Sequence, residues 1–188
     1  MSKTNSSRTL ALGAMFTAIV VVLQLLGSFI HFGPFSISLV LVPIVIGAAL
    51  CGPVIGAWLG FVFGLTVLLS GDAGAFLAVN VPGTIITVLL KGTLCGLVAG
   101  VVYSALKKVN EYLAVLISAI VCPVVNTGVF LICCALFFMP TIREWAGGTS
   151  VLRFMILGLV GGNFLFELIF NIILSSAIIR IINAVKRN

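Results

Sequence analysis

Apolar residues run along this chain in long stretches, and short clusters of Gly, Pro, Asn and charged residues separate them. A helix needs about 20 mainly apolar residues to cross the hydrocarbon core of a bilayer. The pattern therefore predicts an all-α integral membrane protein, a bundle of six transmembrane helices in a single domain over residues 1–188. The expected spans are residues 10–30, 36–50, 54–69, 83–106, 112–139 and 151–182, of which the second and third are short enough to tilt.

Composition supports the same class. Of the 188 residues, 62% are hydrophobic and only 7% are charged, whereas about a quarter of the residues of a soluble domain are charged. Six spans and their connections use up the chain and leave no room for a soluble catalytic domain. The net charge of +6 does not indicate nucleic-acid binding, because the basic residues stand at the ends of the apolar runs.

The distribution of Lys and Arg predicts the orientation of the bundle. An even number of spans places both termini on one side, and most basic residues fall there: Lys3, Arg8, Lys107, Lys108, Lys186 and Arg187. The other side has Arg143 and Arg153. Basic residues concentrate in cytoplasmic loops, so both termini are expected to be cytoplasmic. The outer side then carries the turn-rich connections 31–34, 70–82 and 140–150, which suit a pocket that opens outward.

Several kinds of chemistry are not indicated. The sequence has no metal-binding motif, no phosphate-binding loop for ATP and no evident nucleophile beside its one histidine. The five cysteines lack the spacing of metal ligands and are interpreted as small hydrophobic residues. We therefore expect no enzyme, no cofactor and no metal site.

A row of polar residues lies in the last apolar run. Asn163, Glu167 and Asn171 follow one another at intervals of four, so a helix places them on one face. A carboxylate in the membrane is a functional-site hypothesis by default. The alternative is that these side chains only form hydrogen bonds with neighbouring helices.

Polar residues of two other spans reach a similar depth. At a rise of about 1.5 Å per residue, Lys91, Asn126 and Asn163 lie about 9 to 13 Å below the outer surface. Glu167 is about one turn deeper, within possible reach of Lys91. These residues are candidates for a ligand site, although a Lys91–Glu167 salt bridge that only locks helices together is the alternative.

The outer connections offer further candidates. Asp72 and Asn80 can reach down as part of a lid, and Arg143 and Trp145 offer a cation and a flat stacking surface. Trp145 can equally be an ordinary interfacial aromatic residue.

Small residues form stripes on three spans. The spacing i, i+4 relates Gly56, Gly60 and Gly64, then Gly92, Gly96 and Gly100, and finally Ala14 and Ala18. Such stripes permit close helix contact, either inside the bundle or with another membrane subunit. Packing inside the chain is the favoured use for most of them.

Short motifs along the chain resemble one family. The segment 14–18, Ala-Met-Phe-Thr-Ala, follows a basic N-terminus; the segments 46–57 and 96–103 resemble a turn between helices two and three and a fourth helix; and Asn126-Thr127 resembles a fifth-helix pair. Together with the six spans, these motifs resemble the substrate-binding S components of energy-coupling factor vitamin transporters, of the folate, riboflavin and pantothenate group.

The resemblance implies a function and partners. An S component captures a vitamin or related micronutrient outside the cell and docks onto a transmembrane T component with two ATPases, which supply the energy. It implies that Ala14 and Ala18 contact the T component, and that ligand contacts map by region to Asp72, Asn80, Lys91, Asn126, Arg143, Asn163 and Glu167. Trp145 is added to these candidates from its residue type and its place in the last outer connection. It also implies a multi-pass protein of a bacterial plasma membrane, embedded in the lipid bilayer.

The ligand itself stays open at this level. Lys91 can pair with a carboxylate and Glu167 can accept from an N–H group, so a pantothenate-like molecule is slightly favoured. Two other functions are alternatives: a self-sufficient ion- or proton-coupled carrier that uses Lys91 and Glu167, and a membrane scaffold whose polar residues only tie helices together.

Overall fold

The computed structural model describes residues 3–28, 31–32, 35–36 and 39–187, with side chains over 7–28 and 39–185. Part of the predicted break at 31–34 and the side chains of Lys3, Lys186 and Arg187 lie outside the described residues. In chain order the elements are α1 (Lys3–Gly27), β1 (His31–Phe32), β2 (Phe35–Ser36), α2 (Leu41–Cys51), α3 (Pro53–Ser70), α4 (Gly74–Leu77), α5 (Val81–Leu106), α6 (Glu111–Phe137), α7 (Met139–Trp145), α8 (Val151–Arg153), the π-helix η1 (Phe154–Gly161) and α9 (Gly162–Arg187).

Within the described ranges, five helical stretches are long and apolar enough to cross a membrane. They are Ser7–Gly27, Pro53–Ser70, Val81–Leu106, Glu111–Phe137 and Val151–Val185. Each begins and ends within three residues of a predicted span. The remaining predicted span, residues 36–50, corresponds to α2, which has only 11 residues. Eleven residues of α-helix rise about 16 Å, about half the thickness of the hydrocarbon core.

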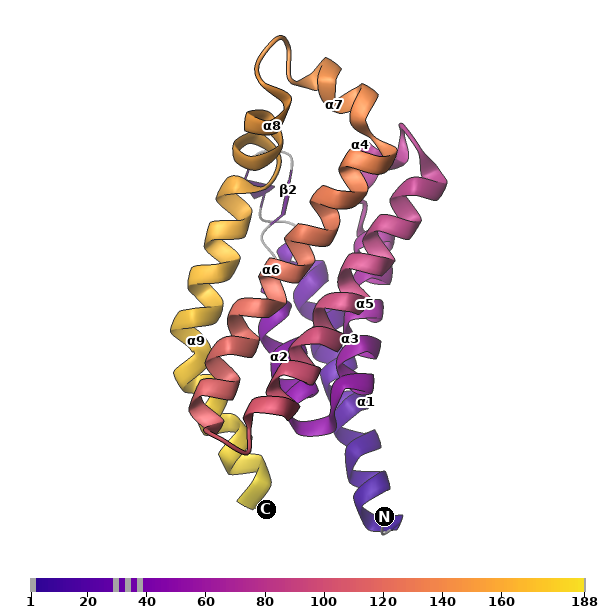
Figure 1. Cartoon of the computed structure of the whole chain (residues 1–188). Coiled ribbons are helices and arrows are strands. Elements are labelled where there is room, and N and C mark those ends of the chain that lie inside the picture. The colour runs from indigo at the N-terminus through magenta and orange to yellow at the C-terminus, as the bar shows by residue number, and fades with distance from the viewer. Residues whose placement is uncertain (1–2, 29–30, 33–34, 37–38, 188) are drawn as a thin grey trace.

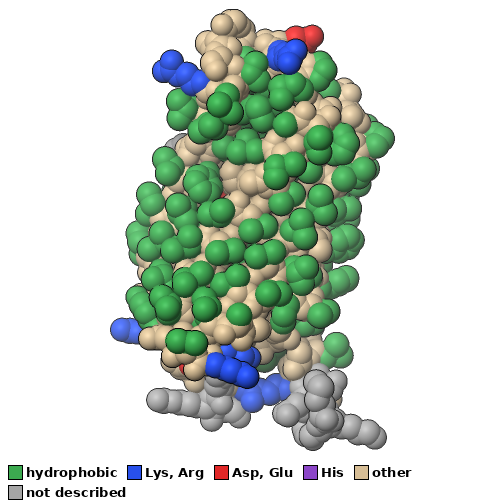
Figure 2. All heavy atoms as spheres, viewed as in Figure 1, with side chains coloured by type: hydrophobic (Ala, Val, Ile, Leu, Met, Phe, Trp, Pro, Cys, Tyr) green, Lys and Arg blue, Asp and Glu red, His purple; other side chains and the backbone are tan. Residues whose placement is uncertain are grey.

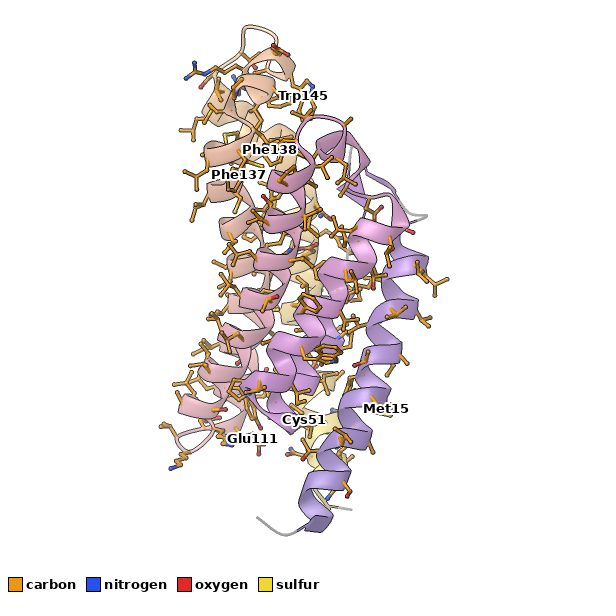
Figure 3. All side chains as sticks on the ribbon, turned by 90° about the vertical axis from the view of Figure 1, so that its right-hand side faces the viewer. Met15, Cys51, Glu111, Phe137, Phe138 and Trp145 are labelled. Atoms are coloured by element: carbon orange, nitrogen blue, oxygen red, sulfur yellow. The ribbon has the colours of Figure 1, made fainter. Side chains whose placement is uncertain are left out.

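The long helices run side by side as one bundle, and Figure 1 places both termini at one end of it. The short helices α4, α7 and α8 and the β1–β2 hairpin lie at the opposite end, where His31 pairs with Ser36. Figure 2 shows hydrophobic side chains over the flank and the charged ones at the two ends. Figure 3 places Trp145 and Phe138 at the end with the short helices and Glu111 near the termini. The bundle therefore presents an apolar flank between two polar ends.

The glycine stripes of α3 and α5 pack against each other. A Cβ atom at Gly60 would overlap the carbonyl oxygen of Gly92, and one at Gly56 would overlap that of Gly96. A Cβ at Gly64 would lie 2.7 Å from the carbonyl oxygen of Val88. The prediction that these stripes serve packing inside the chain is confirmed, because the two backbones meet where the side chains are missing.

Two buried clusters fill the bundle. The larger contains Phe16, Ile44, Leu59 and Tyr103, and the smaller contains Phe76, Cys134, Phe138 and Ile142 near the short helices. All five cysteines are free thiols, four of them buried. Their interpretation as small hydrophobic residues fits this placement.

Candidate ligand pocket

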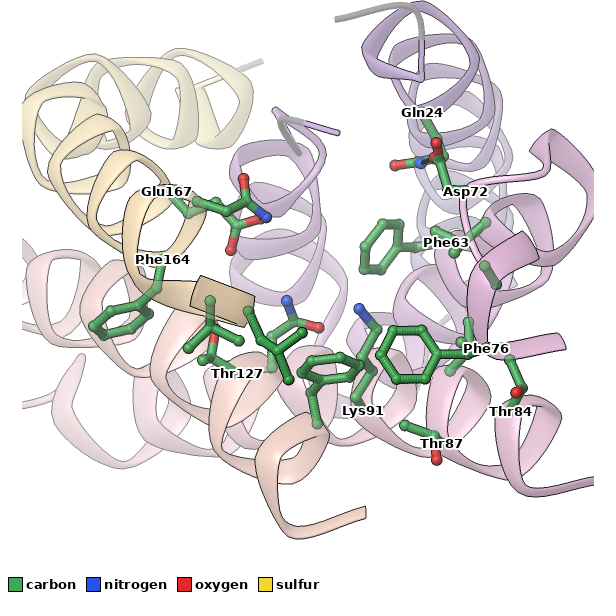
Figure 4. Close-up of a pocket in the computed structure, with 18 of the residues that line it drawn as sticks. Gln24, Phe63, Asp72, Phe76, Thr84, Thr87, Lys91, Thr127, Phe164 and Glu167 are labelled. Carbon is green, nitrogen blue, oxygen red and sulfur yellow. Dashed lines mark hydrogen bonds between the residues drawn. The ribbon is translucent and has the colours of Figure 1, made fainter. Parts of the chain in front are cut away.

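A pocket with a cavity volume of about 90 Å³ lies where the two buried clusters meet. Its walls come from α1, α3, α5, α6 and the η1–α9 stretch, with Asp72 and α4 at the end of the bundle opposite the termini (Figure 4). The lining residues fall into two groups. The polar ones are Gln24, Asp72, Thr84, Thr87, Lys91, Asn126, Thr127, Asn163 and Glu167, and the aromatic ones are Phe63, Phe76, Phe130, Phe138 and Phe164.

Glu167 is the carboxylate of the deep wall, with only 2% of its surface exposed. The side-chain amide of Asn163, one turn earlier on α9, donates to Glu167 Oε1 at 3.4 Å. The Asn126 side chain from α6 interacts with the same carboxylate. Burial of an unpaired carboxylate is strongly unfavourable, so these two amides stabilise Glu167 at this depth.

A second carboxylate stands on the opposite wall. Gln24 of α1 donates through Nε2 to Asp72 Oδ2 at 2.6 Å, and the Ser70 hydroxyl donates to the same oxygen at 3.1 Å. Figure 4 shows Gln24 and Asp72 on one side of the pocket and Glu167 on the other. Asp72 follows Gly71, which ends α3 with a φ of 89°. This left-handed turn favours glycine, and it directs the chain from α3 towards α4.

Lys91 projects from α5 between aromatic rings. Its Nζ lies 5.3 Å from the ring centroid of Phe130 and 5.8 Å from that of Phe63. Rings at these distances attract a cation through their quadrupoles. Gly92, the next residue, faces α3, so the same close helix contact that packs the bundle also sets the position of Lys91.

Phe76 of α4 joins this short helix, which we call the lid because it covers the pocket, to the helices behind it. Its ring makes edge contacts with Phe138 at 5.0 Å, Trp145 at 5.5 Å and Phe130 at 5.6 Å between centroids. Edge-to-face pairs of this kind contribute about 0.5–1.5 kcal/mol each beyond burial. The ring of Phe76 therefore helps to fasten the four-residue helix α4 over the pocket, together with Leu77, which packs against the larger buried cluster.

The structure brings five of the eight predicted ligand-site residues into the pocket lining: Asp72, Lys91, Asn126, Asn163 and Glu167. Asn80 does not line the pocket. Its Oδ1 accepts from the backbone N–H of Gly83 at 3.0 Å and caps α5. Arg143 is exposed on α7, and Trp145 reaches the pocket only through its contact with Phe76.

Sequence reasoning missed Gln24, the aromatic lining and the π-helix. Gln24 was detectable as the lone carboxamide inside the first apolar run, but its partner Asp72 lies 48 residues away. The π-helix η1 ends two residues before Asn163 and contributes Leu159 to the pocket. Such segments are frequent at functional sites, and η1 changes the phase of the helical face that carries Asn163.

The small residues of α1 lie on the outer surface. Ala14 and Ala18 are both exposed, and Ala14 borders a shallow groove between α1 and α3 that Leu10, Thr17, Ile55 and Trp58 also line. The Trp58 indole donates to the Thr17 hydroxyl at 3.2 Å across this groove. This stripe, in contrast to those of α3 and α5, is open to a partner.

Residues 8–182 match the model of a protein family described as "ECF transporter, substrate-specific component". The chain belongs to this family. Its S components are transport proteins, not enzymes; they bind a small-molecule vitamin and associate with T and ATPase components. Family membership and the apolar helices also make the chain a multi-pass membrane protein.

The fold is similar to that of ThiT from Listeria monocytogenes, in a solved structure with 22% sequence identity and a TM-score of 0.69. The alignment covers 92% of this chain and 94% of ThiT. At this identity the likeness concerns the fold alone. No curated protein matches the chain.

Proposed function

We propose that this S component captures a vitamin or related micronutrient outside the cell and delivers it by docking to a T component with two ATPases. The observation that carries this proposal is the pocket itself. It unites five predicted polar residues from α5, α6, α9 and the α3–α4 connection around one shared cavity. Polar groups that only tie helices together would face one another without such a space.

The membrane arrangement belongs to the same proposal. Both termini are cytoplasmic, because most basic residues lie on the same side of the membrane as the termini, as is usual for the cytoplasmic side. These residues include Arg8, Lys107, Lys108 and Arg180. The sixth crossing is the predicted span at residues 36–50, of which α2 supplies 11 residues. The protein forms a single domain in a bacterial plasma membrane. Its pocket opens outward beneath α4.

Docking uses the exposed face of α1. Ala14 and Ala18 present a flat stripe beside the α1–α3 groove, and small residues let another helix approach closely within a bilayer. This surface suits the T component. It lies on the outside of the bundle, so docking does not require direct contact with the ligand.

The identity of the vitamin remains a prediction. A pantothenate-like ligand would place its carboxylate on Lys91 and its N–H group on Glu167. Asn80, Arg143 and Trp145 would then act from the rim of the pocket rather than as part of its lining.

Coexpression with a T component and two ATPases tests the proposal. We expect the ATPases to copurify with this chain and ATP-dependent vitamin uptake to appear in proteoliposomes of the whole complex. Uptake by this chain alone, driven by an ion gradient and abolished by Glu167→Gln, would instead support a self-sufficient carrier. An Asn163→Leu variant that loses stability while uptake by the complex persists would support a structural role for that residue.

A further inference from the structure

Two carboxamides on the deep wall of the pocket are held in the same way. Asn163 of α9 donates through its NH₂ group to Glu167 Oε1 at 3.4 Å, and the Asn126 side chain of α6 also interacts with the Glu167 carboxylate. A carboxylate accepts hydrogen bonds, so it attracts the NH₂ end of an amide. Glu167 therefore orients both asparagines so that the carbonyl oxygen is the other, outer end of each carboxamide.

These carbonyl oxygens are buried acceptors. Neither Asn126 Oδ1 nor Asn163 Oδ1 has a hydrogen-bond partner within the described part of the chain. Asn126 is only 5% exposed, and both residues line the pocket. Ser118 and Asn171 also carry buried oxygens of this kind, but neither residue is part of the described lining. Buried polar groups are normally satisfied, and a bound molecule that donates to Asn126 and Asn163 would satisfy both oxygens.

Gln24 repeats this arrangement on the opposite wall. Its Nε2 donates to Asp72 Oδ2 at 2.6 Å, whereas its Oε1 has no partner among the described residues. Gln24 is 2% exposed and is the only residue that α1 supplies to the described lining. One end of this carboxamide is bound and the other is left at the cavity, which suits a contact with a ligand.

Two buried threonines of α5 add further acceptors. The hydroxyls of Thr84 and Thr87 donate to the carbonyl oxygens of Asn80 and Gly83, each at 2.7 Å. A hydroxyl has one proton and two lone pairs. Because both protons are directed into the backbone of α5, the lone pairs remain for a ligand. The polar lining therefore accepts hydrogen bonds at several points.

Lys91 supplies the opposite kind of group. Its ammonium lies over the rings of Phe63 and Phe130, and Figure 4 shows it pointing into the space between Gln24 and Glu167. An ammonium carries three donors and no acceptor. A ligand carboxylate that binds Lys91 therefore leaves the other polar groups of the same ligand facing carbonyl and hydroxyl oxygens.

Binding in such a pocket depends on the donors that a ligand carries. A molecule that enters displaces water from the amide oxygens, and affinity is lost where it cannot replace those hydrogen bonds. A site built to bind a hydroxyl or N–H group rejects an analogue without that group far more strongly than an apolar pocket rejects a change of one methyl group. The three amide oxygens should therefore select by donors rather than by size.

We propose that Gln24, Asn126 and Asn163 determine the specificity of the pocket, and that they select a small carboxylic acid with hydroxyl or N–H donors on two sides of its body. The inference rests on the proposed capture function and narrows its ligand to this class. Asn126 and Asn163 receive donors on one side, beside Glu167, and Gln24 receives a donor on the other. The carboxylate binds Lys91. An acid of the same shape without donors is rejected, although the five phenylalanines of the lining favour its apolar groups.

A matched pair of probes tests this selectivity. Dihydroxybenzoate and dimethylbenzoate, each substituted at both meta positions, share a flat ring, a carboxylate and nearly one shape, but only the first carries donors on two sides. Both are titrated calorimetrically against the full chain in nanodiscs of zwitterionic lipid, with empty nanodiscs as the blank. We expect the dihydroxy acid to bind at least about tenfold more tightly, although burial of apolar surface alone would favour the dimethyl acid. Equal affinities, the reverse order or no binding of either probe would overturn the proposal.

Two variants locate the selectivity at the amides. Gln24→Met and Asn126→Leu each remove one acceptor at similar volume, so each should lower the affinity ratio of the two probes by at least about threefold. Asn171→Leu is the control and should leave the ratio unchanged, because Asn171 does not line the described pocket. Both probes bind the same protein, so a purely structural defect does not change their ratio. An unchanged ratio in both pocket variants would contradict the assignment, and the wild-type ratio decides the proposal even if a variant fails to fold.

The molecule that copurifies with the protein separates this inference from the proposed function. A retained vitamin that lacks either a carboxylate or hydroxyl and N–H donors would end the inference and leave the capture function standing. If no vitamin is bound and no ATPase associates, the capture function itself fails, and the inference fails with it.

Discussion

The Asn163 side-chain amide donates to the Glu167 carboxylate at 3.4 Å, one turn further along α9. The two residues are related by i, i+4, so they meet on one helical face. This contact gives Glu167 a donor at a depth where water is scarce, and it leaves the Asn163 oxygen without a partner among the described residues. The contact therefore stabilises Glu167 and also leaves one acceptor oxygen in the pocket that a ligand can use.

The first prediction compares two asparagines on that face. Asn163 lines the pocket and Asn171 does not. The Asn171 side chain instead donates to the backbone oxygen of Glu167 at 2.8 Å. Asn163→Leu should lower ligand affinity by about ten- to a hundredfold, because a direct polar contact is lost. Asn171→Leu should leave the affinity within about threefold while it lowers stability. Equilibrium dialysis with the copurified ligand and thermal melting measure the two effects; equal losses of affinity in both variants would argue against a ligand contact at Asn163.

The second prediction concerns the α3–α5 contact. Gly60→Val should destabilise the protein by about 1–3 kcal/mol or more, because its side chain has no room beside the carbonyl oxygen of Gly92. Gly128→Ala is the control, since no atom lies within 4 Å of a Cβ placed there. Denaturation in mild detergent compares the two. Similar stability of both variants would show that the glycine stripes are not tightly packed.

The third prediction separates capping from ligand binding at Asn80. Asn80→Ala should lower stability by about 0.5–2 kcal/mol, because the start of α5 loses its cap. Asn80→Ser retains a capping oxygen and should restore most of that loss. Ligand affinity should change little in either variant, and a large drop in affinity with Asn80→Ser would place Asn80 in the binding site after all.

The fourth prediction concerns the fastening of the lid. Phe76→Ala removes the ring that contacts Phe130, Phe138 and Trp145. Ligand release should become at least about tenfold faster, since each lost ring pair contributes about 0.5–1.5 kcal/mol. Phe76→Tyr retains the ring and should release ligand at nearly the wild-type rate. Unchanged release from Phe76→Ala, measured by dilution into unlabelled ligand, would exclude a fastening role.

The fifth prediction separates docking from capture. Ala14→Trp should prevent copurification of the ATPases, because a large side chain blocks close helix contact, while ligand retention stays unchanged. Val101→Trp, at a residue of α5 that is 51% exposed, is the control and should leave assembly intact. Normal assembly of the Ala14→Trp variant would move the docking surface away from α1.

The long helices and about half of the polar pocket residues were predictable from the sequence for one physical reason. Lipid accommodates few polar groups, so a polar residue inside an apolar run is easily recognised as a candidate for a functional site. Lys91, Asn126, Asn163 and Glu167 were identified in this way. Gln24 was not, because a single carboxamide carries no sign of a partner as distant in sequence as Asp72. The apolar pattern indicated that the second span is short, but it did not reveal that its helix begins only at Leu41 or that a π-helix precedes Asn163. Both features depend on tertiary packing.

Asn80 and Trp145 illustrate a different limit. Both were expected at the ligand because they occur in an outer connection with turn-forming or aromatic character. Asn80 caps α5, and Trp145 packs on Phe76. Residue type gave the correct region of the bundle but not the direction of the side chain, which depends on where each short helix begins.

Native mass spectrometry of the protein in nanodiscs tests the central claim most directly. Wild-type protein purified from cells grown in rich medium should carry one small molecule per chain, and Glu167→Gln should have lost it while its fold and melting behaviour are retained. A wild-type protein that carries no molecule, even after incubation with a mixture of vitamins, would contradict the account.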